Sequence, residues 1–86
     1  MDTLYRIYTE DINPLNIKSA LIEAEVSGYT LLSGNGSWEG ILEPALIIEV
    51  LASSPDKVLK AAELIKAYNR QQTVLLTSTP VQTTLV

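Results

Sequence analysis

The segment from Ser33 to Ala52 constrains the fold more than any other part of the sequence. It reads SGNGSWEGILEPALIIEVLA, and it joins a glycine-rich bend and the single tryptophan to the longest apolar run of the chain. Glycine on either side of Asn35 permits positive φ, so a turn or a bulge is expected at Gly34–Gly36. The segment therefore predicts a β-hairpin, with a first strand from Tyr29 to about Ser33 and a central strand over Ile41–Ala52.

The central strand presents two different faces, because successive side chains of a strand point to opposite sides of its sheet. One face carries Leu42, Pro44, Leu46, Ile48 and Val50. This face is expected to pack under helices. The opposite face carries Ile41, Glu43, Ala45, Ile47, Glu49 and Leu51. It is too apolar for plain exposure to water, so it predicts contact with another molecule. Pro44 lacks an N–H donor, and a bulge or an unpaired position is expected beside it.

The beginning of the chain predicts a strand followed by a helix. Residues 3–9 (TLYRIYT) are rich in β-branched and aromatic side chains, which favour a strand. The pair Asn13-Pro14 is a helix-start signal, since asparagine caps and proline suits the first helical position. The apolar stripe of this helix comprises Ile17, Ala20, Leu21 and Ala24. The helix is expected to run to about Val26, with Gly28 as its left-handed cap.

The end of the chain repeats this pattern in reverse. The pair Ser54-Pro55 predicts a second helix over residues 55–69. Its buried stripe is expected to comprise Val58, Ala61, Ala62, Ile65 and Tyr68. Residues 73–78 (TVLLTS) predict a further strand, which Pro80 is expected to interrupt. Residues 81–86 would form a short fifth strand or a tail.

The resulting β-α-β-β-α-β order predicts an α+β fold of the ferredoxin-like type. Its antiparallel sheet would have both helices on one face. We interpret residues 1–86 as a single domain. A chain of this size buries only roughly 60 to 65% of its unfolded surface, so its core is marginal by itself. Oligomerisation is therefore expected.

Composition excludes several kinds of site. The chain has no cysteine and no histidine, which removes thiol nucleophiles, disulfides and the commonest zinc and copper ligands. Ser33 and Ser37 have no histidine to activate them, so we expect no enzymatic activity, no metal and no cofactor. A net charge of −4 does not favour nucleic acid or anionic membranes. No apolar run reaches the roughly 18 to 20 residues of a membrane span, and a soluble cytoplasmic protein is expected.

Two polar patterns have simpler structural explanations. Residues 34–37 (GNGS) could cradle an anion, but a strand follows them where a phosphate loop needs a helix and a lysine. A turn is favoured there. Glu39 and Glu43 could suggest an acid–base pair, but four residues along a strand separate them by roughly 13 Å, which is too far for that chemistry.

Two segments resemble a known family. Residues 37–43 (SWEGILE) and 69–74 (NRQQTV) resemble the tryptophan-glutamate-glycine hairpin and the following half of CutA-type proteins, which are trimers in the wider group that includes the PII signalling proteins. The likeness covers about residues 28–78. It departs from the family at Leu51-Ala52, where the family has lysine-threonine, and at residues 69–71, where it has histidine-proline-tyrosine.

The resemblance implies a non-enzymatic homotrimer that binds a small anionic ligand, such as a nucleotide, in clefts between subunits. The ligand-binding residues would be Asn35, Ser37, Trp38, Glu39, Lys66 and Arg70. Tryptophan is more typical of a core or subunit contact than of ligand stacking, so a structural or protein-interaction trimer without a ligand pocket is the alternative. Residues 8–11 (YTED) are also similar to small uncharacterised phage proteins.

Burial of the second face of the central strand would strongly favour assembly. The residues expected in the subunit interface are Arg6, Trp38, Ala45, Ile47, Glu49 and Leu51. Glu49 would need a partner there, and Arg6 is the candidate if residues 3–9 run beside the central strand. At about 1.5 to 3 kcal/mol for each large side chain fully buried, a few such residues match the stability of a small domain. Separated subunits are therefore expected to be marginal.

Overall fold

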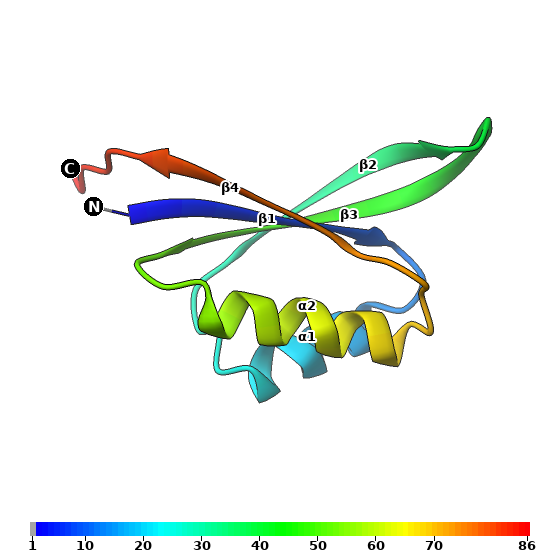
Figure 1. Ribbon diagram of the computed structural model, residues 1–86, viewed down its shortest axis with the longest axis horizontal. Coiled ribbons are helices and arrows are strands. Elements are labelled where there is room, and N and C mark those ends of the chain that lie inside the picture. Colours follow the sequence, from blue (N-terminus) through cyan, green and yellow to red (C-terminus); the bar gives the residue numbers. More distant parts are fainter. Residues whose placement is uncertain (1) are drawn as a thin grey trace.

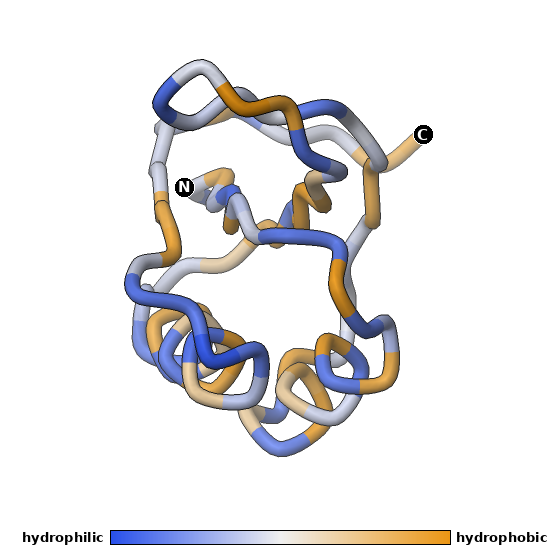
Figure 2. The backbone as a smooth tube through the Cα atoms, turned by 90° about the vertical axis from the view of Figure 1, so that its right-hand side faces the viewer, coloured by the Kyte–Doolittle hydropathy of each residue, from blue (hydrophilic) through white to orange (hydrophobic). Residues whose placement is uncertain are grey.

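The computed structural model describes residues 2–86. Its elements are β1 (Asp2–Glu10), α1 (Pro14–Glu23), β2 (Thr30–Trp38), β3 (Ile41–Ala52), α2 (Asp56–Tyr68) and β4 (Leu75–Val81). The strands form one antiparallel sheet in the order β2-β3-β1-β4. Both helices cover the same face of this sheet (Figure 1), and they lie side by side when the molecule is viewed end-on (Figure 2). The predicted α+β, ferredoxin-like arrangement is confirmed.

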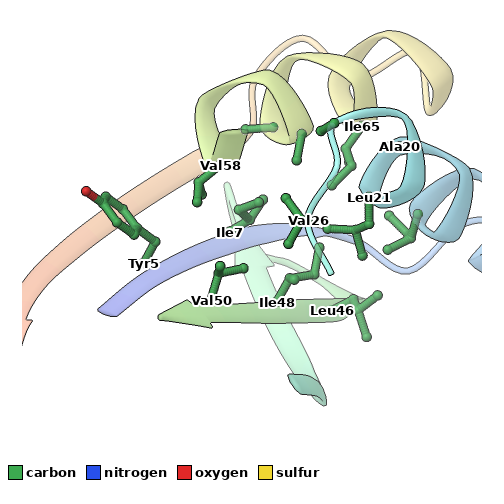
Figure 3. Close-up of a cluster of buried hydrophobic side chains, with 14 residues drawn as sticks. Tyr5, Ile7, Ala20, Leu21, Val26, Leu46, Ile48, Val50, Val58 and Ile65 are labelled. Carbon is green, nitrogen blue, oxygen red and sulfur yellow. The ribbon is translucent and has the colours of Figure 1, made fainter. Parts of the chain in front are cut away.

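The core lies between the sheet and the two helices (Figure 3). Alternate residues of the two central strands point into it, and Ile7 of β1 faces Ile48 of β3 in register. The largest fully buried side chains are Ile7, Ile17, Leu21, Ile48, Ile65 and Val58. Ala20 of α1 and Ala61 of α2 are also fully buried, and their small side chains permit the helices to approach the sheet closely.

The predicted buried stripe of α2 is wrong at its last member, Tyr68. This side chain is 39% exposed, and its hydroxyl donates a hydrogen bond to the carboxylate of Glu23 on α1. The hydrogen bond to Glu23 is the main cause that raises the pKa of Tyr68, with smaller contributions from desolvation and from the negative charge. Tyr68 thus joins the outer surfaces of the two helices instead of filling the core.

The end of α1 lies earlier than predicted. The helix ends at Glu23, and Glu25 adopts the left-handed conformation with φ of 61°. The N–H of Val26 donates to the Leu21 carbonyl at 2.9 Å, which is the long bond of a Schellman motif. Both of these apolar side chains are buried. The prediction that Gly28 is the left-handed cap is therefore wrong. Glu25, three residues earlier, takes that conformation, because burial of Val26 fixes the end of the helix there.

The hairpin turn lies at Glu39-Gly40. The strand β2 runs without interruption to Trp38, which pairs with Ile41. The φ values of Glu39 and Gly40 are 50° and 80°, and positive φ at both central residues is typical of a type I′ turn. The predicted break at Gly34–Gly36 is wrong, since these residues lie within the strand in continuous register with β3.

Pro44 causes no bulge in β3. It pairs in register with Asn35 of β2. On its other side it lies one position beyond Ala45, the last β3 residue that pairs with β1. At this point only its carbonyl is used on the β1 side, where it accepts a hydrogen bond from the N–H of Asp11 at 3.1 Å. The expected irregularity is therefore wrong, because the missing N–H falls where the ladder with β1 ends.

Pro80 does not interrupt β4, which continues to Val81. The strand lies at the edge of the sheet, and edge strands tolerate proline because one side of their backbone has no ladder partner. No fifth strand forms in residues 82–86, so the tail alternative holds for this segment. The tail is joined to β1 by the Thr83 hydroxyl, which donates to the Asp2 carboxylate at 3.0 Å.

Candidate functional site

The face of the sheet opposite the helices, which we call the outer face, has no element of the described chain packed over it (Figure 1). The strand register brings apolar side chains from all strands into one line across it. This apolar row comprises Leu32, Ile47, Tyr8 and Leu75. Its two end members are 42% and 59% exposed, and its two central members are partly buried. A single chain thus presents an uninterrupted apolar line to solvent.

An ion pair lies in the next line of the outer face. Arg6 of β1 stands opposite Glu49 of β3, and its Nε donates to Glu49 Oε2 at 2.7 Å. The register prediction for this pair is confirmed. The hydrogen bond to Glu49 is the largest cause that raises the pKa of Arg6, against a smaller opposing effect of desolvation. On the side of this pair away from the apolar row, Leu4 stands opposite Leu51, so the charges lie between two apolar lines.

The outer face is hollowed at this end, where β1 begins and β3 ends. A cavity of about 510 Å³ lies there, and we call it the outer-face cavity. Its lining residues are Leu4, Gly28, Tyr29, Thr30, Glu49, Leu51, Val81 and Thr83. Leu4 and Leu51 are neighbours on the two central strands and provide an apolar floor, while the residues before β2 and after β4 provide the walls. The volume is within the range of small-molecule and side-chain pockets.

The opposite end of the outer face is the hairpin tip, residues 38–41. Trp38 and Ile41 pair across it, and they are 69% and 67% exposed. The hairpin projects beyond the helical layer (Figure 1). For this reason Leu42 and Pro44, expected under the helices, are exposed. The tip therefore presents large apolar side chains far from the core.

A third feature, a smaller apolar cavity of about 210 Å³, lies between α1 and β2. Its lining residues are Pro14, Ile17, Lys18, Leu21, Tyr29, Leu31 and Leu46. The inner side of β2 is only thinly covered there, and Leu31 is 47% exposed. Lys18 is the one charged side chain of this lining, so the cavity offers little polar chemistry.

The residues predicted to bind a ligand fall into two separate groups. Asn35, Ser37, Trp38 and Glu39 belong to the hairpin, whereas Lys66 and Arg70 lie at the end of α2. This helix leads into β4, which is at the opposite edge of the sheet from β2. None of these side chains lines either of the two cavities above. Within the described chain no hydrogen bond or ion pair joins the two groups, so the chain by itself does not gather them into a single pocket.

The predicted interface residues, unlike the predicted ligand residues, share one face of the sheet. Arg6, Ala45, Ile47, Glu49 and Leu51 are all on β1 or β3 and point to the outer face, as the register shows. Trp38 has the same orientation in β2 but lies further along the hairpin. Between the tip and the apolar row, β2 and β3 carry Gly34, Gly36, Glu43 and Ala45 on the outer face. Glu43 is the one large side chain among these four.

Arg70 has an unusual backbone. Its φ is 54°, and the N–H of Gln71 donates to the Lys66 carbonyl at 3.0 Å. The arrangement is a Schellman motif in which arginine stands where glycine is commonest. A non-glycine residue in this conformation is strained by about 1 kcal/mol or more. Glu39 of the same predicted group also has a positive φ, at the hairpin turn, and Glu25 has the same conformation at the end of α1. The conformation therefore accompanies a turn or a helix end and does not by itself distinguish Arg70.

Sequence reasoning missed a buried polar network beside Arg70. Thr9 and Asn69 are only 5% and 8% exposed. The Asn69 side-chain amide donates to Gln71 Oε1 at 3.0 Å and to Thr9 Oγ1 at 3.4 Å, and its oxygen accepts from Asn16 at 3.1 Å. Thr9 also donates to Gln71. Among the residues described, no buried side-chain polar atom lacks a partner. The network thus fastens the end of β1 to both helices, a structural role.

In residues 2–86, no three acidic, histidine or cysteine side chains come together in a way that could hold a metal ion. No helix in the same range is long and apolar enough to cross a membrane.

Comparisons with known proteins give a similarity of fold. The crystal structure of a DUF3240 family protein from Shewanella baltica OS155 matches with a TM-score of 0.74 and 14% sequence identity, over 99% of this chain and 94% of that chain. The de novo designed protein Foldit4 matches with a TM-score of 0.48 and 12% identity, over 94% of this chain and 97% of that chain. No protein-family model matches the sequence, and no curated protein matches it. The first match supports the α+β fold.

Proposed function

We propose that the protein is a non-enzymatic interaction module that acts as a homotrimer, with the outer face of each sheet buried between copies. The observation that carries this proposal is the apolar row, which crosses all the strands on a face without helices. Monomeric proteins rarely leave large continuous apolar patches in water, and such patches commonly mark interaction surfaces. The number of copies rests on the resemblance of residues 37–43 to CutA-type trimers.

The energetics favour this assembly. Each large apolar side chain contributes about 1.5 to 3 kcal/mol when it passes from full exposure to full burial. Leu32, Leu51 and Leu75 are still 42%, 55% and 59% exposed, so much of this contribution is unused in a single subunit. A small domain has a total stability of about 5 to 15 kcal/mol. Burial of the outer face would therefore be a large part of the stability of each copy.

The ion pair fits the same arrangement. A buried carboxylate without a partner would strongly oppose association. Glu49 already accepts a hydrogen bond from Arg6 in the single subunit, so its charge is compensated before the copies meet. The outer face can then be buried without leaving this carboxylate unpaired.

A pair of matched variants tests the assembly. Ile47→Lys places a charge in the apolar row, whereas Ile22→Lys places the same charge on α1, where Ile22 is 66% exposed. Size exclusion with light scattering should give a trimer for the wild type and for Ile22→Lys, and smaller species for Ile47→Lys. A trimer that survives Ile47→Lys unchanged would show that the outer face is not the interface.

A second candidate function is the binding of a small anionic ligand, such as a nucleotide, in a cleft between copies. Two cations, Lys66 and Arg70, lie near each other at the end of α2 and support it. Guanidinium and ammonium groups are the usual partners of phosphate oxygens. Asn35, Ser37, Trp38 and Glu39 lie at the other edge of the sheet, so the hairpin of one copy would have to approach the end of α2 in another.

Arg70→Gly separates binding from folding. Glycine removes the guanidinium and relieves the left-handed strain, so thermal stability should stay equal or rise. A panel of nucleotides is then titrated while the thermal midpoint is followed. Ligand at 100 times its dissociation constant should add about 2.7 kcal/mol to the free energy of unfolding of the wild type, and much less to that of the variant. Absence of any shift at millimolar nucleotide in the wild type would rule out this candidate and leave the interaction module.

A further inference from the structure

We propose that the hairpin tip of one copy inserts Trp38 into the outer-face cavity of the next copy. This inference rests on the proposed assembly through the outer face, and it names the two surfaces that meet. The tip and the cavity lie at opposite ends of the same face. One is a projecting apolar group and the other is an apolar hollow.

The tip has the properties of an interface anchor. Trp38 is 69% exposed at the end of an extended hairpin. A two-residue turn at Glu39-Gly40 closes the hairpin tightly, so little backbone freedom is lost when the tip is held by a partner. Tryptophan is also among the side chains that most often dominate the energy of protein interfaces. An exposed tryptophan in this position is best explained by a partner surface that buries it.

The cavity is chemically suited to an indole ring. Leu4 and Leu51 offer an apolar floor for the ring, and the volume of about 510 Å³ is ample for one large side chain. Indole carries one N–H donor and no acceptor. The cavity supplies acceptors in Glu49, whose Oε2 is taken by Arg6, and in the hydroxyls of Thr30 and Thr83. The N–H of Trp38 would therefore not be left unpaired.

One cation beside the cavity can contribute to the contact. Residues 30–43 contain Glu39 and Glu43 and no cation. On the described outer face, the strand register gives Arg6 as the cationic side chain, and only its Nε is engaged by Glu49. Its remaining guanidinium N–H groups can receive a carboxylate from the hairpin of another copy. Glu49 and Asp2 add negative charge at the same end of the face, so a single ion pair to Arg6, and not the overall charge, would favour this contact.

The contact must form between copies, because one copy cannot make it. Trp38 pairs with Ile41, and Leu51 lies ten residues further along β3, which is roughly 33 Å at the rise of a strand. A contact between two different surfaces is heterologous, and repetition of such a contact around an axis closes a ring. The tip-to-cavity contact is therefore compatible with a closed trimer.

The only tryptophan of the chain gives a direct spectroscopic test. In wild-type protein at micromolar concentration, Trp38 emission should be blue-shifted and protected from acrylamide. Leu51→Gln alters the cavity floor, and it should shift the emission to the red and raise quenching several-fold. Ile22→Gln, on the exposed side of α1, is the matched control and should change neither signal. Equal spectra for all three proteins would overturn the inference.

Cross-linking keeps this test separate from that of the assembly. The chain has no cysteine, so thiols can be placed freely. One double variant carries Ile41→Cys with Thr30→Cys, which joins the tip to the cavity wall, and another carries Ile41→Cys with Lys66→Cys, which joins the tip to α2. A short bis-maleimide should give covalent multimers with the first double variant, well above the yield from each single variant.

Each other outcome has a definite meaning. Cross-links with Lys66→Cys alone would overturn the inference and would place the tip at the end of α2, as the ligand-cleft candidate requires. A trimer by light scattering without either cross-link would overturn the inference while the proposed assembly stands. A monomer by light scattering would overturn both.

Discussion

The two faces of the sheet differ sharply although they are made from the same strands. On β3, Ile48 is fully buried under the helices, while its neighbour Ile47 lies partly exposed on the outer face. Both faces are rich in apolar side chains, but only one is covered within the chain. The apolar content of β3 therefore exceeds what a single copy of the chain can bury. The excess is concentrated on one surface, and this is the physical basis for the proposed assembly.

The largest expected effect comes from truncation on the inner face. Ile48→Ala removes buried methyl groups and leaves a cavity, so it should lower the free energy of unfolding by about 2 to 5 kcal/mol. Ile47→Ala is the matched variant on the outer face. At a protein concentration low enough to separate the copies, Ile47→Ala should lower the free energy of unfolding in urea much less than Ile48→Ala. Equal losses from the two substitutions would remove the distinction between the faces.

The second effect concerns association. Leu75→Gln changes an end member of the apolar row, and the loss of one large buried side chain corresponds to about 1.5 to 3 kcal/mol, or roughly ten- to hundred-fold weaker assembly. Leu85→Gln is the control, because Leu85 lies fully exposed in the tail. Sedimentation over a dilution series measures both. A control that weakens assembly as much as Leu75→Gln would mean that general polarity, and not the apolar row, is responsible.

A smaller effect is expected from the ion pair of the outer face. Arg6→Gln and Glu49→Gln each leave one charge without its partner, and this charge becomes more unfavourable when the face is buried. Each single variant should therefore weaken assembly, and the double variant should recover part of the loss. The dissociation midpoints of the wild type, the two single variants and the double variant together form a double-mutant cycle. Zero coupling between the two positions would show that the pair stays in water.

The smallest effect belongs to the helical layer, at Tyr68. Its pKa is raised by the hydrogen bond to Glu23, so the folded state favours the protonated phenol. The resulting stability is present below the unfolded value of about 10 and is lost as pH rises through the higher folded value. The free energy of unfolding, measured by denaturation at neutral and at strongly alkaline pH, should fall more for the wild type than for Tyr68→Phe. Identical pH dependence would show that this bond contributes nothing.

Much of the sheet could be predicted from the sequence because side chains alternate with a strict period of two. That rule separated Ile47 from Ile48, and it also placed Arg6 opposite Glu49 once the two strands were taken as neighbours. The start of α1 could be predicted equally well, since the Asn13 side chain accepts from the Leu15 N–H as a helix cap does. These features depend on local chemistry and on one simple periodicity.

The turn and the helix ends could not be predicted as reliably. Two segments, Gly34–Gly36 and Glu39-Gly40, both allow positive φ, and only the pairing of the whole β2 with β3 selects the second. Gly28 predicts a later end of α1, but burial of Val26 ends the helix before it. Long-range packing decides such cases, and it has no local signature.

The candidate site shows the same division. The predicted interface residues on β1 and β3 follow from alternation, and the structure places them together on the outer face. The ligand group mixed hairpin residues with Lys66 and Arg70, which the order of the strands puts at opposite edges. The outer-face cavity was not predicted at all, because its walls come from residues near 29 and 82, which the folded sheet places on opposite sides of the two central strands.

The mass of the wild-type protein in solution shows directly whether the outer face is buried between copies. Light scattering after size exclusion at micromolar concentration should give three times the subunit mass of 9.4 kDa, with Trp38 protected from solvent. A single peak at the mass of one subunit, with the chain folded and Trp38 open to quenchers, would contradict burial of the outer face between copies.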